Sequence, residues 1–542
     1  MTGLGRRVRP HPLAFLIGLL ALLALAAGST SASVGASESA RGPRLPFQVN
    51  TSLSPESKEH TAILVQNNSR QAATIVMDFY TPGGVLIPLA SEIHPEVPAW
   101  STRTFSQALN QGLLPGFRGV GVLSSDRPLN ALLMREAVGT GNTRSYAVHN
   151  AYADSGKRVA LPYVANQLDE DGTVTNTRFS IANAGLDAAC VTLTYELVPG
   201  RGAASSNGGT TLVSSDVASE SCPDGGWAIP AAGQMTLAPD QGTLATAMPS
   251  GTVNALMSVM IDSTQPVTVA VDIYGGDNGN ARLASYNGFV VDKNRPGTTE
   301  DDISRRVVMP LAQKSVGGYW TEYAIANPWA EAISGSIVYQ GTIDGDPDRD
   351  VLVTVEIEMP AGGGITHSVY DSAELPEGFE GWAMVYADRP VAALLLRASW
   401  RDTDSYAAAN GVPKGRTTKS AKFPLVFRNV NGWQDQEGTN SWIGIAVADG
   451  GKAELEIVAV NNPAGAIKGC EGLALFQTTI TIEGSFVFDQ GADDKDKTGL
   501  GALPTCMMGG MVIRSNKPIA AIGGVTSDLQ AGDNDALYNA FP

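Results

Sequence analysis

The sequence contains few of the residues from which enzyme active sites are usually built. It has only five histidines in 542 residues, and no two of them form an HExxH pair. It also lacks the GxSxG turn of serine hydrolases, the GxxxxGK[ST] phosphate-binding loop and the GxGxxG dinucleotide-binding turn. None of the sequence repeats described below holds His, Ser and Asp at spacings that suggest a catalytic triad. We therefore expect a protein without enzymatic activity.

Positive charge and long apolar runs are also scarce. The chain has 37 Lys and Arg against 54 Asp and Glu, a formal net charge of −17 and a pI near 4.8. Without a basic patch to displace counterions, such a chain is a poor partner for nucleic acid or anionic lipid, and we expect no nucleic-acid partner. Beyond the N-terminus no apolar run is long enough to span a bilayer, so we expect no transmembrane segment in the mature chain.

The N-terminus has the order of a secretory signal peptide. Arginines at positions 6, 7 and 9 precede an apolar stretch from Leu13 to Ala27, and small residues follow up to Ala36. We predict that residues 1–36 are a cleaved signal peptide. The mature protein is then secreted and extracellular, or held at the cell surface.

Cysteine is rare, with four in the whole chain, and an exported protein normally pairs such cysteines in disulfides. Three pairings are possible. Cys190 and Cys222 fall in one sequence repeat and Cys470 and Cys506 in another, so we predict the disulfides Cys190–Cys222 and Cys470–Cys506. No two cysteines are spaced as CxxC, which argues against a zinc site.

What the sequence does contain is internal repetition. Each of four copies opens on a proline between apolar residues and continues, about twenty residues later, with an alternating strand that ends on Asn in the first three copies. Each copy then reaches a strand, a polar turn and a second proline that begins another apolar run, and a tyrosine closes the copy. The opening prolines are Pro46, Pro162, Pro310 and Pro424, the second prolines are Pro128, Pro266, Pro390 and Pro518, and the closing tyrosines are Tyr146, Tyr286, Tyr406 and Tyr538. The opening prolines are 116, 148 and 114 residues apart, a spacing of domains.

Strand patterns dominate each copy. Alternation such as that from Thr74 to Phe79, many β-branched residues and turns about every 8–12 residues are typical of antiparallel β-sandwiches. We predict an all-β chain of four tandem antiparallel β-sandwich domains: residues 37–152, 159–291 with an insertion at 199–233, 307–412 and 423–542. The short polar linkers predict a semi-extended string of domains with limited swing. One short helix is expected within residues 105–113.

The recurring frame has an opening proline, a strand that ends on Asn, an LPxGFxG-like turn such as Leu375 to Gly381, and an SDRP-like turn before the second proline. This frame resembles the tandem Ig-like or fibronectin-III-like repeats of bacterial exported and cell-surface proteins. The resemblance covers nearly the whole mature chain and is one of architecture. It implies a role in surface structure, adhesion or presentation, and it supplies no catalytic or ligand-binding residue.

The best candidate for a metal site is an acidic loop, and no other cofactor is expected. The alternating aspartates Asp344, Asp346, Asp348 and Asp350 can present several oxygens to Ca²⁺. The loop does not follow the EF-hand pattern, because Arg349 stands where the glycine of the sixth position belongs. The alternative is a solvated acidic tip of a β-hairpin.

Two tryptophans of the fourth copy are candidates for ligand binding. Trp433 and Trp442 are nine residues apart among Asn, Gln and Asp, a setting that suits a sugar-binding face. An aromatic residue at a strand boundary also packs on the core, which is the alternative. Arg135 and Arg397 each lie seven residues past the second proline of their copy, and we expect them to be matched ion-pair or edge residues rather than a site.

Repetition itself points to function. Duplicating a domain multiplies reach and contact area but does not improve a single reaction centre. We predict a non-enzymatic structural or adhesion protein that acts as a multi-domain spacer with interaction surfaces. Its expected partners are further copies of itself or other cell-surface proteins and polysaccharides. The alternatives are an array of carbohydrate-binding modules and a subunit of an extracellular filament or surface layer.

Overall fold

Antiparallel β-strands make up most of the described chain. The computed structural model of the protein describes residues 45–51, 58–138, 144–151, 155–170, 173–202, 211–213, 222, 225–241, 252–275, 282–291, 302–399, 405–430, 438–461, 475–489, 507–527 and 535–542. Within these ranges the helical segments are single 3₁₀ turns at Pro88–Ala90, Gln107–Leu109 and Lys414–Arg416. The all-β prediction is therefore confirmed, and the helix expected within residues 105–113 is reduced to one such turn.

None of the helical segments in the described ranges has the length and hydrophobicity needed to cross a membrane.

The first group of strands forms two sheets, with orders β1-β6-β3-β4 and β5-β2-β7-β8. The strands are β1 (Leu45–Thr51), β2 (Lys58–Asn67), β3 (Ala73–Tyr80), β4 (Glu92–Val97), β5 (Thr102–Ser106), β6 (Phe117–Ser125), β7 (Leu129–Val138) and β8 (Arg144–Asn150). On β3 every second side chain is buried, as the alternating pattern predicts. Those side chains pack against Ile63, Phe105 and Leu133 from the opposite sheet, so the two sheets form a sandwich.

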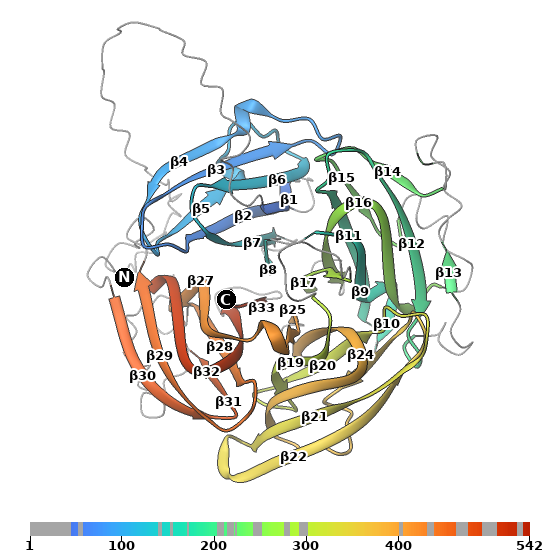
Figure 1. Cartoon of the computed structure of the whole chain (residues 1–542), viewed down its shortest axis with the longest axis vertical. Helices are drawn as coiled ribbons and strands as arrows, with labels where there is room; N and C mark the ends of the chain where they lie inside the picture. The colour runs from blue at the N-terminus through green and yellow to red at the C-terminus, as the bar shows by residue number, and fades with distance from the viewer. Residues whose placement is uncertain are drawn as a thin grey trace, which may run out of the picture. The chain divides into compact units, whose positions relative to one another are not determined.

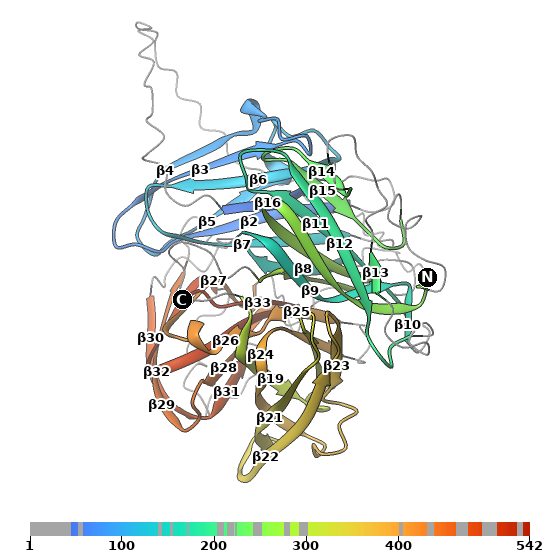
Figure 2. The same cartoon turned by 45° about the vertical axis from the view of Figure 1, so that its right-hand side comes forward.

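The same order recurs in three further groups of strands (Figures 1 and 2). The second group consists of β9 (Gly156–Asn166), β10 (Leu168–Glu170), β11 (Thr173–Asn183), β12 (Ala189–Leu197), β13 (Thr211–Val213), β14 (Trp227–Ile229), β15 (Gln234–Leu237), β16 (Ala255–Gly275), β17 (Arg282–Asn287) and β18 (Phe289–Val290). The third consists of β19 (Ser304–Gln313), β20 (Tyr319–Ala326), β21 (Ile333–Ile343), β22 (Asp346–Met359), β23 (Gly364–Ser368), β24 (Phe379–Ser399), β25 (Tyr406–Asn410) and β26 (Val412–Pro413). The fourth consists of β27 (Thr418–Arg428), β28 (Thr439–Val447), β29 (Lys452–Asn461), β30 (Leu475–Glu483), β31 (Ser485–Asp489), β32 (Met507–Ser527) and β33 (Asp535–Asn539). Among the described strands, no ladder joins one group to another.

One long strand in each of the last three sandwiches belongs to both of its sheets. β16, β24 and β32 each run for 21 residues, and each is exposed only in its middle. In β24 the first half pairs with β19 and β21 and the second half with β20 and β25. The prediction that a turn at the second proline ends one strand is met only in the first sandwich, where β6 and β7 are separate. In the others the strand changes partners at Pro266, Pro390 or Pro518, and the missing N–H of proline is tolerated there.

Three of the four opening prolines lie at irregularities of their strands, whereas Pro46 lies in a regular part of β1. The pairing of β9, β19 and β27 with the long strands shifts register beside Pro162, Pro310 and Pro424. Because proline donates no hydrogen bond to a ladder, it is found at such bulges. In the second and third sandwiches the carbonyl of the next residue accepts a tyrosine hydroxyl, from Tyr286 at 2.7 Å and from Tyr323 at 2.8 Å.

The asparagines that end the alternating strand fix the turn that follows. The side-chain amide of Asn67 donates to the carbonyls of Gln71, Val97 and Pro98, and its Oδ1 accepts from the Ser69 amide. Asn183 and Asn327 make the equivalent bonds and are equally buried. These side chains satisfy backbone groups at a corner where the ladder ends. The fourth copy has Val447 there, followed by a turn with two glycines at positive φ.

The expectation of a semi-extended string is wrong, because the first sandwich contacts the fourth. Residues from 41 to the end form one compact unit. Its four closing strands β8, β17, β25 and β33 contact one another in a closed cycle, including β33 with β8 (Figure 1). Apolar cores are shared as well: Leu64, Leu132 and Val148 of the first sandwich pack into the core of the fourth. Burying these apolar faces against each other is more favourable than leaving them in water between separate domains.

Candidate functional site

The centre at which the four sandwiches meet is held by asparagine side chains. The closing strands end on Asn150, Asn287, Asn410 and Asn539. Each side chain reaches to the backbone of the asparagine in the preceding sandwich, and Asn150 of the first sandwich reaches to Asn539 of the last. The four residues therefore form a closed hydrogen-bonded cycle, which we call the asparagine tetrad.

Three of the four contacts in the tetrad have two hydrogen bonds. The Asn150 amide donates to the Asn539 carbonyl at 2.8 Å, and its Oδ1 accepts from the Asn539 backbone N–H at 3.0 Å. The pairs Asn539–Asn410 and Asn410–Asn287 repeat this arrangement. In the fourth contact the Asn287 amide donates to the Asn150 carbonyl at 2.9 Å, and Asn287 Oδ1 accepts no backbone N–H of the described chain. In the other three contacts, both the side-chain N–H and the side-chain oxygen bond to the neighbouring backbone.

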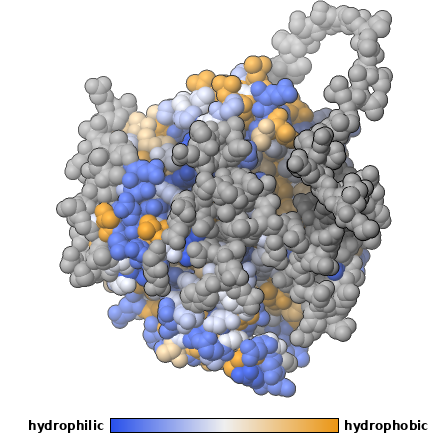
Figure 3. All heavy atoms as spheres, turned by 180° about the vertical axis from the view of Figure 1, so that it is seen from behind, coloured by the Kyte–Doolittle hydropathy of each residue, from blue (hydrophilic) through white to orange (hydrophobic). Residues whose placement is uncertain are grey.

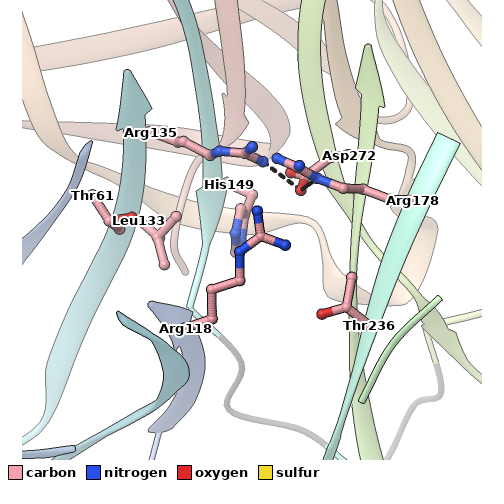
Figure 4. Close-up of a pocket in the computed structure, with 8 residues that line it drawn as sticks. All are labelled: Thr61, Arg118, Leu133, Arg135, His149, Arg178, Thr236 and Asp272. Atoms are coloured by element: carbon pink, nitrogen blue, oxygen red, sulfur yellow. Dashed lines mark hydrogen bonds and ion pairs between the residues drawn. The ribbon is translucent and has the colours of Figure 1, made fainter. Parts of the chain in front are cut away.

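A cluster of charged residues joins the first sandwich to the second (Figure 4). Arg135 lies 2.5 Å from Asp272 and 2.8 Å from Glu59, and Arg178 contacts the same two carboxylates. Burial by itself lowers the pKa of Arg135, but Asp272 and Glu59 outweigh this effect and the pKa is raised. His149 lies beside the cluster, and its burial lowers its pKa. The cavity between these residues has a volume of about 20 Å³, which is room for one water molecule.

Two other junctions have buried ion pairs of the same kind. Between the third and fourth sandwiches Arg397 lies 2.5 Å from Asp535, and its guanidinium is 3.5 Å from the ring centre of Tyr319 and 4.5 Å from that of Trp442. Between the second and third, Arg201 pairs with the buried Glu322. Burial raises the pKa of Glu322, and Arg201 opposes that rise. The prediction that Arg135 and Arg397 form matching ion pairs is confirmed, and both pairs join neighbouring sandwiches.

A larger cleft lies between the third and fourth sandwiches. Its volume is about 940 Å³, within the range of small-ligand sites. One wall comes from β21, β22 and the start of β24, and the other from the end of β30, Gly484 and β31. Trp442 and Arg397 also line the cleft. Of the cavities described here, this cleft alone has both the size and the mixed polar and aromatic lining of a binding site.

The cleft contains hydrogen-bond donors that no protein group uses. Trp382 is 6% exposed, and its Nε1 is buried without a partner. The side-chain amide of Gln340 makes no hydrogen bond within the described residues, and it lies next to the same glycine, Gly484, as Trp382 Nε1 does. A Cβ at Gly484 would lie 3.6 Å from both nitrogens. The absence of a side chain at position 484 therefore leaves space in front of both donors.

The structure brings some of the predicted site residues together. Trp442, Asp344 and Asp350 all line the cleft, although they come from two different sandwiches. Trp442 is 3% exposed and stacks on Arg397, so packing is its main role, as the alternative reading held. Asp346 and Asp348 lie on β22 outside the cleft lining.

The acidic loop forms the tip of the β21–β22 hairpin. Asp344 accepts from Arg349 at 3.1 Å, and the Asp346 side chain accepts from the Asp348 amide. Within the described ranges no three acidic, cysteine or histidine side chains are grouped closely enough to hold a metal ion. Calcium binding at this loop stays a prediction.

The disulfide prediction is confirmed for the second sandwich and stays a prediction for the fourth. Cys190 and Cys222 are bonded, and they tie part of the insertion to the start of β12. Cys470, Cys506 and the predicted ligand residue Trp433 lie outside the described residues.

Sequence reasoning missed the asparagine tetrad. The closing tyrosine was chosen as the common feature, but Tyr146 and Tyr406 lie four residues before the tetrad asparagine, whereas Tyr286 and Tyr538 lie directly before it. Aligning the four closing strands on their last residue would have revealed an asparagine in every copy. In each copy a glycine or alanine follows that asparagine.

Comparison with known proteins adds little to these contacts. No protein-family model matches the chain, and no curated protein matches it. A solved structure described as "Crystal structure of tetra-tandem repeat in extending region of large adhesion protein" is similar at 11% identity and a TM-score of 0.10, over 92% of this chain and 99% of the other. A likeness with this TM-score carries no argument, so the conclusions below rest on the contacts of the chain itself.

Proposed function

We propose that the chain is an exported, non-enzymatic protein that acts as a rigid platform for structural or adhesive contacts at the cell surface. The observation that carries the proposal is the closure of the four sandwiches through the asparagine tetrad. A spacer gains length from each added domain, whereas a closed arrangement gains fixed relative positions for its surfaces. We therefore replace the predicted spacer with a platform and keep the predicted interaction surfaces.

The use of buried charged residues supports a non-enzymatic role. The buried Arg135 cluster, the Arg397–Asp535 pair and the Arg201–Glu322 pair all join one sandwich to the next. Charged side chains that are paired with opposite charges in this way favour a defined arrangement and are not poised for proton transfer. The cavity beside His149 holds no organic substrate, because its volume is about 20 Å³.

The surface of the first sandwich supports a role in contacts. Half of the twelve exposed large hydrophobic residues in the described chain lie within residues 85–114. They are Val85, Leu86, Leu89, Ile93, Leu109 and Leu114, with exposed fractions from 40% to 89%. Figure 3 shows hydrophobic residues gathered at the upper edge of the face seen there, on the side of the first sandwich. Exposed apolar groups of this kind are typical of surfaces that meet other macromolecules.

Two finer parts of the proposal have separate support. The disulfide Cys190–Cys222 supports export, because such bonds persist in oxidising compartments. The pairing of β2 with β5 and of β3 with β6 matches strands B–E and C–F of an Ig-like sandwich. The order differs from the Ig pattern at β1 and β7, which pair with β6 and β2, so it supports a β-sandwich of a related but different order.

The test is binding of the purified chain to isolated cell envelopes, measured by co-sedimentation, together with a turnover screen on glycoside, ester and peptide substrates. We expect saturable binding and no turnover. Turnover that is lost when one Asp or His is replaced would overturn the proposal, and so would failure to bind any envelope fraction. Ordered polymers of the purified chain in electron micrographs would favour the filament or surface-layer alternative.

A further inference from the structure

We infer that the cleft between the third and fourth sandwiches binds a polysaccharide chain that carries no negative charge. This inference deepens the proposed function and rests on it, because it names one surface polymer and the site that holds it. The site is built around Trp382, Gln340 and Gly484, and it differs from the predicted Trp433–Trp442 face.

The first argument is the pair of unused donors. A buried N–H without an acceptor, such as Trp382 Nε1, is less favourable than one that is satisfied. Trp382 Nε1 and the Gln340 amide converge on the space in front of Gly484, which lines the cleft. A ligand with hydroxyl or ether oxygens accepts from both groups, and the cost disappears on binding.

The second argument is the lining around these donors. Tyr319 and Phe486 are half-buried and present aromatic surface to the cleft, while Thr342, Thr481 and Ser485 add hydroxyl groups. A sugar ring has an apolar face of C–H groups and an edge of hydroxyls. Aromatic surface beside groups that both donate and accept hydrogen bonds matches that chemistry.

The third argument is the negative charge of the cleft lining, which favours uncharged or positively charged polysaccharides over acidic ones. Asp344, Asp350, Glu380 and Glu483 line the cleft, and within the described ranges only Asp344 and Glu483 of the four have basic partners, Arg349 at 3.1 Å and Lys452 at 3.6 Å. The cation among the lining residues, Arg397, is already paired with Asp535. A polymer with carboxylate or phosphate groups would bring like charges together in this space. Neutral sugars and amino sugars meet no such penalty.

An extended peptide is the competing occupant, and the observations favour it less. A peptide usually needs a deep apolar pocket for an anchoring side chain, or an open strand edge for its backbone. The aromatic residues of the cleft that are most buried, Trp382 and Trp442, pack on the interface between the sandwiches and leave no such pocket. The open edge of β22 is acidic near the cleft, where Asp348 and Asp350 are exposed.

The experiment measures binding of the full purified chain to three soluble polymers: hydroxyethyl cellulose, chitosan oligosaccharides and polygalacturonate. We compare the wild type with Trp382→Phe, which removes the indole N–H and keeps an aromatic ring, and with Gln340→Ala. Glu356→Gln, on the exposed face of β22 outside the cleft lining, is the matched control. Urea unfolding midpoints verify that each variant is folded.

We expect binding of the cellulose derivative or the chitosan oligosaccharides, weakened at least tenfold in Trp382→Phe and in Gln340→Ala, and unchanged in Glu356→Gln. Preferential binding of polygalacturonate, wild-type affinity in both cleft variants, or capture of an extended peptide from a library by the cleft would each overturn the inference. If the two variants still sediment with cell envelopes while no glycan binds, the cleft inference fails and the platform proposal stands. If the wild type binds no envelope at all, the platform proposal fails.

Discussion

Replacing Asp535 by alanine should destabilise the folded chain by about 3–5 kcal/mol, the usual cost of removing one partner of a buried ion pair. The side chains of Arg397 and Asp535 are 7% and 1% exposed, and their closest charged atoms are 2.5 Å apart. Arginine stays ionised in a protein, so the substitution leaves a positive charge buried between the third and fourth sandwiches. Stacking on Tyr319 and Trp442 compensates only in part, because a cation over an aromatic ring gains about 0.5–2 kcal/mol.

The chain offers a matched control in the third sandwich. Arg389 and Glu331 form an ion pair at 2.8 Å, but their side chains are 45% and 63% exposed. Because water screens this pair, Glu331→Ala should cost about 1 kcal/mol or less. The two substitutions remove a carboxylate from similar geometries, and they differ mainly in burial.

Urea unfolding, followed by tryptophan fluorescence and circular dichroism, measures both effects. The double variant Arg397→Met with Asp535→Ala should recover much of the loss, since it removes the unpaired charge. The reasoning is refuted if Asp535→Ala is as mild as Glu331→Ala. It is also refuted if the double variant is less stable than Asp535→Ala alone.

Three further outcomes follow from the structure. Burial lowers the pKa of His149 below its unfolded value of about 6.5, so the stability of the folded chain should fall as the pH drops below that value. The variant His149→Gln should flatten the plot of urea midpoint against pH, and an unchanged slope would contradict this. A Cβ at Gly524 would lie 2.0 Å from the ring of Trp442, so Gly524→Ala should lower stability by about 1–3 kcal/mol and alter the tryptophan fluorescence spectrum. A variant with wild-type stability and spectrum would disprove this. Removing the bond Cys190–Cys222 by double serine substitution should cost about 2–5 kcal/mol in thermal unfolding, and no change in midpoint would speak against it.

The local features of the fold were predictable from the sequence because they depend on short-range patterns. Alternation along Ala73–Tyr80 predicts a half-buried strand, and the structure buries every second residue there. The pairing of Cys190 with Cys222 followed from their place in one copy. The matching of Arg135 and Arg397 as ion pairs followed from equal spacing to a proline.

The contact of the first sandwich with the fourth was not predictable, because it joins residues that are far apart in the sequence and share no local pattern. Asn150 and Asn539 are 389 positions apart, and each is an ordinary residue at a strand end when read alone. Short polar linkers are compatible with a string and with a closed arrangement, since the linker fixes reach but not direction. The apolar face that decides between them, including Leu132 and Val148, reads in the sequence as part of an ordinary sandwich core.

The cleft was found only in part for a related reason. Trp442 was singled out for its neighbours in the sequence, but its neighbours in space are Arg397 and Gly524. Trp382 and Gln340, which hold the unused donors, lie in strands whose pattern signals only alternation. Their significance depends on the turn at Gly484 in another sandwich, and a sequence does not show that proximity.

The ion pairs give the chain a parity that the asparagine tetrad lacks. The first and third sandwiches supply Arg135 and Arg397, while the second and fourth supply the acids Asp272 and Asp535. If two sandwiches of the same kind met at such a junction, an arginine would face another arginine instead of an acid. At these two junctions an arginine-bearing sandwich is therefore followed by one that bears the acid. The first and second sandwiches thus form one complementary pair and the third and fourth form another, each with the arginine on its first member and the acid on its second.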